Sequence, residues 1–368
     1  MAEMNASCIA AATIFQHQMC DLPCDQAIYM TTWESGTGSG TRWHTYMNAI
    51  TRTVGTDTMV RLWSTKPFQS YVTSECASGD EWCYFSVADD CIDRASPNSV
   101  ANTTKENLVT YTYGKSMKTF TPALREGLNR SEMWLQSQVL FFILQPKQFI
   151  RDWVDEFWSA NSTTRFSTND NIHKDTPYLI MHVRWGDKCA WSSAKRGRES
   201  ICVPFRKYME QANAFRALNP ELNHIILSST DPKAIKMTRR HTNWTFSWIV
   251  AERKLLSQQN HMIPAKEKLG EKQMVDIKAL MTEFYLAAYA DYAVVTASSG
   301  WSRAFLRWSR ALRGHIIPNA CLDDWNWDAS IVGLNDSRLP EIRDAYRESL
   351  GTERYCFAHR ENCSEVFS

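Results

Sequence analysis

The sequence predicts an α/β protein made of two Rossmann-like halves, and three observations support this fold class. Segments with strand character alternate with segments of helical periodicity in both halves of the chain. Several strand segments are near-continuous apolar runs, which are typical of strands buried on both faces of a parallel sheet. The chain has 368 residues, 44% of them hydrophobic, so it is long enough to bury a core in each of two domains.

The first half, over residues 1–170, contains a strand, a glycine-rich loop, a helix and a second strand. This order defines one α/β unit. Residues 1–30 are Cys-rich and predict an irregular or short-helical entry. In chain order, the expected elements are a strand (29–33), a glycine-rich loop (34–44), a helix (43–52), a strand (59–63), a long loop tied by disulfides (76–110) and helices over 122–158 broken at Pro146.

The second half, over residues 171–340, repeats the alternation after a polar linker at 159–177 that ends in Pro177. A tail over 341–368 completes the chain. In chain order, the expected elements are a strand (178–184), a helix (204–218), a strand (224–229), a helix (234–241), a strand (245–250), a helix (271–290), a strand (292–296) and a helix (301–313) closed by Gly314.

Composition excludes some classes of function. Lys and Arg (41) nearly balance Asp and Glu (40), which argues against a general nucleic-acid-binding domain. The longest fully apolar run, 139–144, is far shorter than the roughly 20 residues that a membrane-spanning helix needs. Fifteen Trp residues offer flat faces for core packing and also for stacking on sugars.

Cysteines and glycosylation sequons favour the secretory pathway. The chain has 11 Cys, several in close pairs, and none in the paired C-x2-C spacing of a zinc ribbon. The close pairs are Cys20/Cys24, Cys76/Cys83, Cys189/Cys202 and Cys356/Cys363. Seven N-x-[ST] sequons begin at Asn5, Asn102, Asn129, Asn161, Asn243, Asn335 and Asn362. The alternative is a cytosolic protein with scattered thiols and chance sequons.

The N-terminus does not match a signal peptide, because it lacks a basic region and a long apolar stretch. We therefore expect a lumenal protein, in the Golgi or secreted, whose anchor or signal is missing from this sequence.

The first candidate site segment is 182–188, His-Val-Arg-Trp-Gly-Asp-Lys. A strand places His182 and Arg184 on the same face, and a glycine turn then presents Asp187 and Lys188. Arg is the natural bidentate partner of a phosphate. The alternatives are a satisfied core histidine at His182 and a structural ion pair between Arg184 and Asp187.

Three further segments stand where a ligand of an α/β fold is expected. Asp231 follows the strand at 224–229. Ser298 and Ser299 precede a helix that also carries Arg303, and a helix N-terminus attracts anions. Gly38 and Gly40 permit close backbone approach in the loop 34–44. A helix cap and an ordinary turn are the alternatives, but together these segments predict a diphosphate pocket between the two halves.

These motifs resemble those of the α-1,6-/O-fucosyltransferase superfamily over residues 30–315. The segment 182–188 is similar to the first peptide motif of that family, 228–232 to the second, and 283–303 to the third. The glycine loop resembles that of the α-1,6 type. The resemblance implies a GT-B-like fold, in which two Rossmann-type domains face a nucleotide-sugar cleft, and a distant member that uses GDP-fucose.

The resemblance also implies roles for individual residues. Arg184 would hold the β-phosphate of GDP-fucose, with His182 supporting the nucleotide or diphosphate. The remaining donor-site residues would be Asp231, Glu283, Ser298, Ser299, Arg303, Gly38 and Gly40, with Glu283 at the guanine or ribose. Lys188 would face the sugar or acceptor.

The sequence departs from the family at two positions. Trp185 replaces a second Arg, and Ser192 replaces the Glu proposed as the base in the α-1,6 enzymes. Asp187 and Glu199 are the nearest carboxylates that could replace it. The chain also ends before the C-terminal SH3-like domain of the animal α-1,6 enzymes.

The expected activity is inverting, metal-independent transfer of fucose from GDP-fucose to a hydroxyl of a glycan or glycoprotein. The absence of Asp-x-Asp from the chain favours a metal-independent mechanism. We expect no further cofactor and no nucleic-acid partner. The alternatives are a GT-B enzyme with another nucleotide sugar, or a non-catalytic glycan- or nucleotide-binding relative. An NAD-dependent dehydrogenase is disfavoured, because the glycine loop lacks the G-x-G-x-x-G register.

Overall fold

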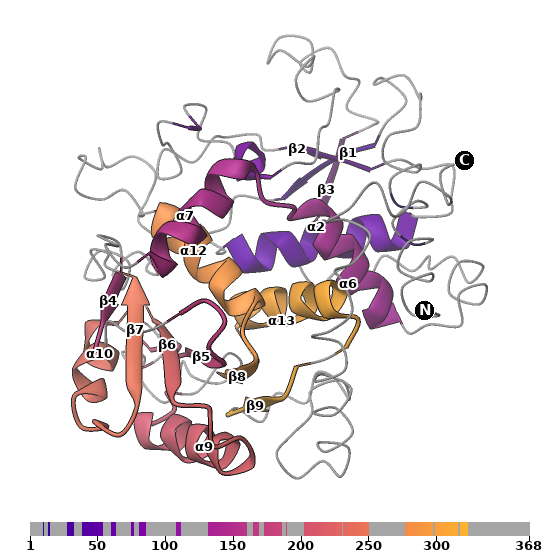
Figure 1. Ribbon diagram of the computed structural model, residues 1–368. Coiled ribbons are helices and arrows are strands. Elements are labelled where there is room, and N and C mark those ends of the chain that lie inside the picture. The colour runs from indigo at the N-terminus through magenta and orange to yellow at the C-terminus, as the bar shows by residue number, and fades with distance from the viewer. Residues whose placement is uncertain are drawn as a thin grey trace.

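A computed structural model of the chain confirms the α/β class (Figure 1). The described residues form a three-stranded and a six-stranded sheet, with helices between and outside them. The structure describes residues 10, 14, 28–32, 39–53, 60–63, 75–76, 81–85, 108–111, 132–159, 165–168, 173–185, 189, 202–229, 231–249, 277–296, 299–315 and 317–322.

The first sheet is parallel and has the strand order β2-β1-β3. Its strands are β1 (Ile28–Thr32), β2 (Val60–Trp63) and β3 (Leu108–Tyr111). Helix α2 (Ser39–Thr53) connects β1 to β2 and contacts both, so the predicted strand–helix–strand unit is confirmed. Its start at Ser39 is four residues before the expected position.

The long loop expected over 76–110 is only partly correct. It contains a short 3-10 helix, η3 (Glu81–Tyr84), and β3 begins at its end. The four residues of β3 carry too little periodicity to be recognised alone. Their strand conformation depends on parallel pairing with β1, a contact between distant parts of the sequence.

The second sheet has the order β4-β7-β6-β5-β8-β9. Its members are β4 (Arg165–Ser167), β5 (Tyr178–His182), β6 (His224–Ser228), β7 (Thr245–Ile249), β8 (Tyr292–Val295) and β9 (Asn319–Cys321). Numbered from β5 along the chain, the five parallel strands follow the Rossmann order 3-2-1-4-5. The structure thus confirms the expected Rossmann-type second half.

Two edge strands of this sheet differ from the sequence expectation. The segment expected to be a linker contains β4, which pairs antiparallel with β7. Strand β9, which pairs with β8, was not expected. Each has three residues, so tertiary pairing rather than local propensity decides their conformation.

The central strands are buried on both faces, as their apolar sequences predict. Every residue of β5, β6 and β8 is buried. In β5, Ile180 packs into one hydrophobic core, and its neighbours Leu179 and Met181 pack into another. This alternation is the two-residue period of a strand between two helix layers.

The two helix layers on this sheet differ in their partners. Helices α9 (Phe205–Leu218) and α10 (Pro232–Thr238) cover one face. On the other face, α12 (Ile277–Ala288) and α13 (Gly300–Arg313) share a core with α6 (Glu132–Ile143), α7 (Gln148–Trp158) and α2. Figure 1 shows α12 and α13 between the six-stranded sheet and the helices of the first half. One continuous core therefore joins elements from the two ends of the chain.

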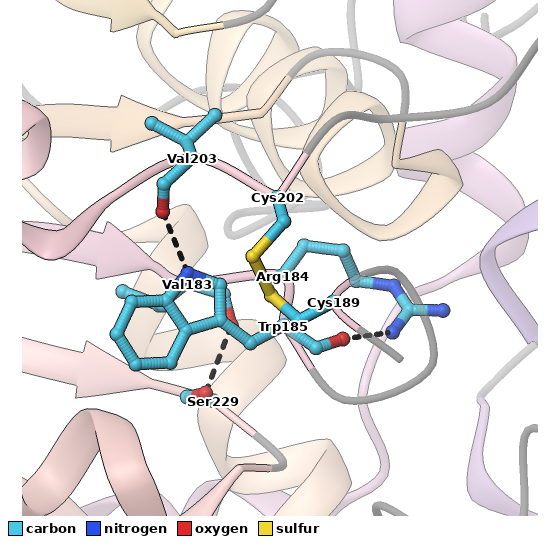
Figure 2. The surroundings of a disulfide bond; sticks show 7 residues. All are labelled: Val183, Arg184, Trp185, Cys189, Cys202, Val203 and Ser229. Carbon is cyan, nitrogen blue, oxygen red and sulfur yellow. Dashed lines mark hydrogen bonds between the residues drawn. A yellow bond between two sulfur atoms is a disulfide. The ribbon is translucent and has the colours of Figure 1, made fainter. Parts of the chain in front are cut away.

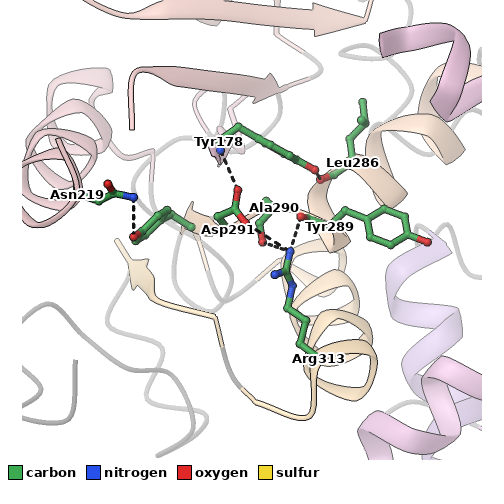
Figure 3. A network of polar contacts seen from close by, with 8 residues as sticks. Tyr178, Asn219, Leu286, Tyr289, Ala290, Asp291 and Arg313 are labelled. Atoms are coloured by element: carbon green, nitrogen blue, oxygen red, sulfur yellow. Dashed lines mark hydrogen bonds and ion pairs between the residues drawn. The ribbon is translucent and has the colours of Figure 1, made fainter. Parts of the chain in front are cut away.

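A polar network lies where β5 and β8 begin, at the amino ends of the strands (Figure 3). Asp291 accepts a hydrogen bond from the Tyr178 backbone N–H at 2.9 Å and faces Arg313 at 3.8 Å. The Tyr178 hydroxyl donates to the Leu286 carbonyl, and Arg313 also donates to the Ala290 carbonyl. The network ties α12 and α13 to the starts of β5 and β8, which is a structural role.

We predict that Asp291→Asn reduces the pH dependence of stability. Burial raises the pKa of Asp291 to about 6, although Arg313 and the Tyr178 N–H act in the opposite direction. The native carboxyl therefore binds its proton more tightly than the unfolded one. Its stabilising contribution is complete below pH about 4 and is lost as the pH rises through about 6. The change across the whole of this window is of the order of 3 kcal/mol.

Thermal unfolding midpoints at pH 4.5 and 7.5 measure this effect. Relative to Asp291→Asn, the wild type should gain stability at pH 4.5. Asp175→Asn, at an exposed position, is the matched control and should follow the wild type. Parallel pH profiles for the wild type and Asp291→Asn would contradict the prediction.

Candidate functional site

The candidate site lies at the point where the strand order of the second sheet reverses. Strands β5 and β8 are neighbours there, and the connections that follow them run to opposite sides of the sheet. Ligands of such sheets bind beyond the carboxyl ends of these two strands. His182 ends β5, and Thr296 directly follows β8. The first and third sequence clusters therefore meet at one place.

His182 is held by the first turns of α13. Its Nδ1 lies 2.6 Å from the Ser302 hydroxyl, and the Phe305 ring approaches it edge-on. Burial, with a smaller contribution from the Arg184 charge, lowers the pKa of His182 to about 3. The imidazole is therefore neutral at physiological pH, and Arg184 supplies the positive charge.

Arg184 and Trp185 follow β5 and extend in opposite directions (Figure 2). The Trp185 indole N–H donates to the Val203 carbonyl at 2.7 Å, beside the Cys189–Cys202 disulfide. The disulfide and this hydrogen bond thus hold Trp185 and Cys189 close to Cys202 and Val203. Arg184 is partly exposed, and its guanidinium also donates to the Trp185 carbonyl. Trp185 therefore has a clear structural role.

The second sequence cluster follows β6, the neighbour of β5. The Ser229 hydroxyl donates to the Val183 carbonyl at 2.8 Å, which ties the ends of the two strands together. Asp231 is the N-cap of α10 and accepts from the Lys233 backbone N–H. This contact accounts for one oxygen of Asp231 by helix capping.

Glu283 reaches the same region from α12. It is 8% exposed, and its carboxylate accepts a hydrogen bond from the Ser228 hydroxyl at 3.0 Å. Ser228 is the register partner of His182 in the sheet. Glu283 and His182 are therefore anchored at adjacent strand ends by two different serines.

The N-terminus of α13 completes this edge. Ser299 occupies the N-cap position, but its side chain makes no capping hydrogen bond, so capping does not account for its hydroxyl. The Thr296 hydroxyl is fully buried and has no hydrogen-bond partner within the described part of the chain. Arg303 lies one turn along the helix. A helix N-terminus with nearby arginines and small hydroxyl side chains is suited to an anion.

His44 lies on α2 and connects that helix to the N-terminus of α13. Its Nε2–H donates to the Gly300 carbonyl at 3.0 Å, and its Nδ1 accepts from the Arg307 guanidinium at 2.8 Å. Because a carbonyl only accepts and a guanidinium only donates, these contacts fix one neutral tautomer. Burial, then Arg307 and Arg303, lower the pKa of His44 well below its usual value. Trp43 lies against Trp301 beside it.

The structure thus brings together His182, Arg184, Glu283, Ser299 and Arg303. Asp231 stands at the end of the adjacent strand β6, and Gly40 lies one helical turn before His44. Five other predicted residues lie outside the described residues: Gly38, Asp187, Lys188, Glu199 and Ser298.

Sequence reasoning missed Ser302, His44, Arg307 and Ser228, all of which contact predicted residues or their helix. Three of them had an available signal, since Ser302 and Ser228 lie in the segments 283–303 and 228–232 that resemble family motifs, and His44 ends the glycine loop. Arg307 could be identified only from tertiary contacts.

Disulfides join two of the predicted close pairs, Cys76–Cys83 and Cys189–Cys202. Within the described residues, no group of three or more His, Cys, Asp or Glu side chains is placed to hold a metal ion. No helix in the described part of the chain is both long and apolar enough to span a bilayer.

Comparisons with known proteins give similarity at the level of overall structure. No protein-family model matches the sequence, and no curated protein matches it. Fucosyltransferase NodZ from Bradyrhizobium is similar with a TM-score of 0.44 and 10% identity, over 81% of this chain and 96% of NodZ. NodZ α-1,6-fucosyltransferase soaked with GDP-fucose gives 0.43 and 11%, over 81% and 95%.

POFUT1 in complex with GDP-fucose gives a TM-score of 0.32 and 10% identity, over 83% of this chain and 76% of POFUT1. NodZ is an α-1,6-fucosyltransferase, the enzyme class that the sequence motifs resemble. Similarities of this size do not transfer residue roles, so the inference of function rests on the motifs and on the site itself.

Proposed function

We propose that this protein is a glycosyltransferase that transfers fucose from GDP-fucose to a hydroxyl of a glycan or glycoprotein. The observation that carries the proposal is the arrangement at the switch point of the second sheet. His182, Arg184 and the N-terminus of α13 lie at the carboxyl ends of β5 and β8. The motif that resembles the fucosyltransferases therefore stands where a Rossmann-type sheet binds a nucleotide.

The diphosphate of the donor binds between Arg184 and α13. The Arg184 guanidinium pairs with the β-phosphate, and the N–H groups of the first turn of α13 face the other phosphate oxygens. His182 contributes a hydrogen bond rather than a charge, because its imidazole is neutral. These donors also stabilise the negative charge that develops on the leaving GDP.

The transfer is a single displacement with inversion. The acceptor hydroxyl oxygen forms a bond to C1 of fucose as the bond from C1 to the β-phosphate oxygen breaks, and GDP leaves. A carboxylate takes the hydroxyl proton. Asp187 and Glu199 are the candidates for this base, with Lys188 at the sugar or acceptor. Our proposal requires no metal, because Arg184 and the helix N-terminus supply the positive charge.

Glu283 selects guanine among the bases. A carboxylate only accepts hydrogen bonds, and guanine offers two adjacent donors, N1–H and the 2-amino group. Uracil offers one donor, and adenine has an acceptor at N1. The Ser228 hydroxyl holds this carboxylate at a buried position beside His182. A fixed and desolvated carboxylate discriminates strongly, since a base without matching donors leaves it unpaired.

Two other functions remain alternatives, each with its own outcome in binding experiments. A GT-B enzyme for a different nucleotide sugar would prefer UDP or ADP to GDP. A non-catalytic glycan- or nucleotide-binding relative is suggested by Ser192, which stands where the α-1,6 enzymes have Glu. It would bind GDP or a glycan without turning over GDP-fucose.

The proposed location is the lumen of the secretory pathway, with the Golgi as the expected compartment. Two disulfides and the excess of sequons support it. Among the sequon asparagines, Asn243 lies within the described residues. It is exposed in the turn before β7, at the amino ends of the strands and away from the candidate site.

We predict that Arg184→Ala abolishes stabilisation by GDP and turnover of GDP-fucose, because it removes the phosphate partner. Thermal shift with GDP, UDP and ADP, without added metal, measures binding, and release of GDP measures turnover. Arg206→Ala on α9, where the side chain is 78% exposed, is the matched control. Near-normal activity of a folded Arg184→Ala protein would refute the donor-site assignment.

We predict that Glu283→Gln weakens GDP binding by roughly tenfold and narrows the preference for GDP over UDP and ADP. Gln keeps the size of the side chain but replaces one acceptor oxygen with a donor. Glu156→Gln on α7, which loses its ion pair with Lys278, is the control for stability. If Glu283→Gln kept the wild-type preference for GDP, another residue would have to recognise the base.

We predict that Asn243 carries an N-linked glycan when the chain is expressed with a signal peptide. Digestion with a glycosidase specific for N-glycans should shift the mass of the wild type by one glycan more than that of Asn243→Gln. Equal shifts for the two proteins would show that this exposed sequon is not used.

A further inference from the structure

We propose that Ser302 is a positioning residue that fixes His182 as a hydrogen-bond donor toward the donor diphosphate. The proposal deepens the proposed function and rests on it for the identity of the ligand. Its structural part, the tautomer of His182, stands on contacts within the protein alone.

The contact between Ser302 and His182 determines where the histidine proton lies. Ser302 is fully buried, and among the described residues its hydroxyl has one hydrogen-bond neighbour, Nδ1 of His182 at 2.6 Å. If Nδ1 carried the proton and donated it, the serine O–H would be a buried donor without an acceptor. Buried donors are almost always satisfied in proteins. The serine therefore donates to Nδ1, and the proton of the neutral imidazole is on Nε2.

The Nε2–H group is available to a ligand. No described residue accepts a hydrogen bond from Nε2, and this atom is not among the fully buried side-chain atoms that lack a partner. Because Nε2 is absent from that group of atoms, it keeps some accessible surface, and His182 as a whole is 7% exposed. The Phe305 ring packs edge-on against the imidazole and, with Ser302, limits its rotation. A fixed donor thus stands at the end of β5, beside the Arg184 guanidinium.

This arrangement suits a phosphate oxygen better than the other tautomer would. An imidazole with its lone pair on Nε2 would repel an anion, whereas Nε2–H attracts it. Protonation of both nitrogens would also provide a donor, but burial and the Arg184 charge oppose it. Through Ser302, α13 therefore sets the tautomer of the donor at the end of β5, while its own N-terminus supplies further N–H donors.

The tautomer can be tested directly in the protein without nucleotide. Ring ¹⁵N shifts of protein labelled at its nine histidines report which nitrogen is protonated, and His182→Gln assigns the signal. We expect Nε2–H in the wild type. In Ser302→Ala the signal should shift toward a mixture of tautomers, and Ser302→Thr should restore the wild-type pattern because it keeps the hydroxyl. A wild-type signal from Nδ1–H would overturn the proposal without any variant.

Nucleotide binding tests the functional part. We expect the Kd for GDP to rise roughly tenfold in Ser302→Ala and to recover in Ser302→Thr. Ser309→Ala is the matched control, because Ser309 is an equally buried serine of the same helix whose hydroxyl has no hydrogen-bond partner. It should leave both the His182 signal and the GDP affinity unchanged.

The failures of the two proposals are distinguishable. If wild-type protein does not bind GDP, the proposed function fails, and the tautomer measurement still decides the role of Ser302. If wild-type protein binds GDP and Ser302→Ala binds it equally well, Ser302 does not position the donor. Equal loss of affinity in Ser302→Ala and Ser309→Ala would indicate a general effect on α13 and would also overturn the proposal.

Discussion

The packing of α13 against both halves of the chain is the constraint on which the candidate site depends. Its apolar side enters the core that α2, α6 and α12 share, with Phe305 and Trp308 fully or almost fully buried. Its first turns contact His182 from the second sheet and His44 from the helix after the glycine loop. The same burial that stabilises the helix therefore fixes its N-terminus against both polar segments.

The electrostatics of the site follow from burial beside arginine side chains. His182 and His44 both lie close to guanidinium groups, and desolvation is the largest cause of the low pKa of each. Both imidazoles are therefore neutral at physiological pH, while the guanidinium groups of Arg184, Arg303 and Arg307 stay charged. The charge of these five side chains is thus constant over the physiological pH range. The proposed donor would meet hydrogen-bond donors that do not titrate.

The sequence was sufficient to predict what depends on local pattern. The runs that became β5, β6 and β8 are buried on both faces, so their apolar character identified them and the residues that follow them. Gly314, in the left-handed conformation at the end of α13, gave the end of that helix. The short strands β3, β4 and β9 were missed because strand pairing decides their conformation.

Polar contacts between distant segments could not be predicted from a single sequence, for a related reason. Ser302 and His182 are 120 residues apart, and His44 and Gly300 are 256 apart. No local periodicity encodes such a distance. Asp231 caps α10 through a local contact, and its position beyond a strand end did not by itself predict that structural role.

The chain directly after Arg184 is fixed by one covalent and one polar contact. The Trp185 indole N–H donates to the Val203 carbonyl at 2.7 Å, and the neighbouring Cys202 is joined to Cys189 with the two Cα atoms 4.9 Å apart. Val203 lies two residues before α9, whose apolar face packs on the same sheet as β5. The end of β5, with Arg184, is therefore held against the start of α9 on one side, while Ser302 of α13 holds His182 on the other. Two helices on opposite faces of the sheet thus fix the two neighbouring polar residues of the first sequence cluster.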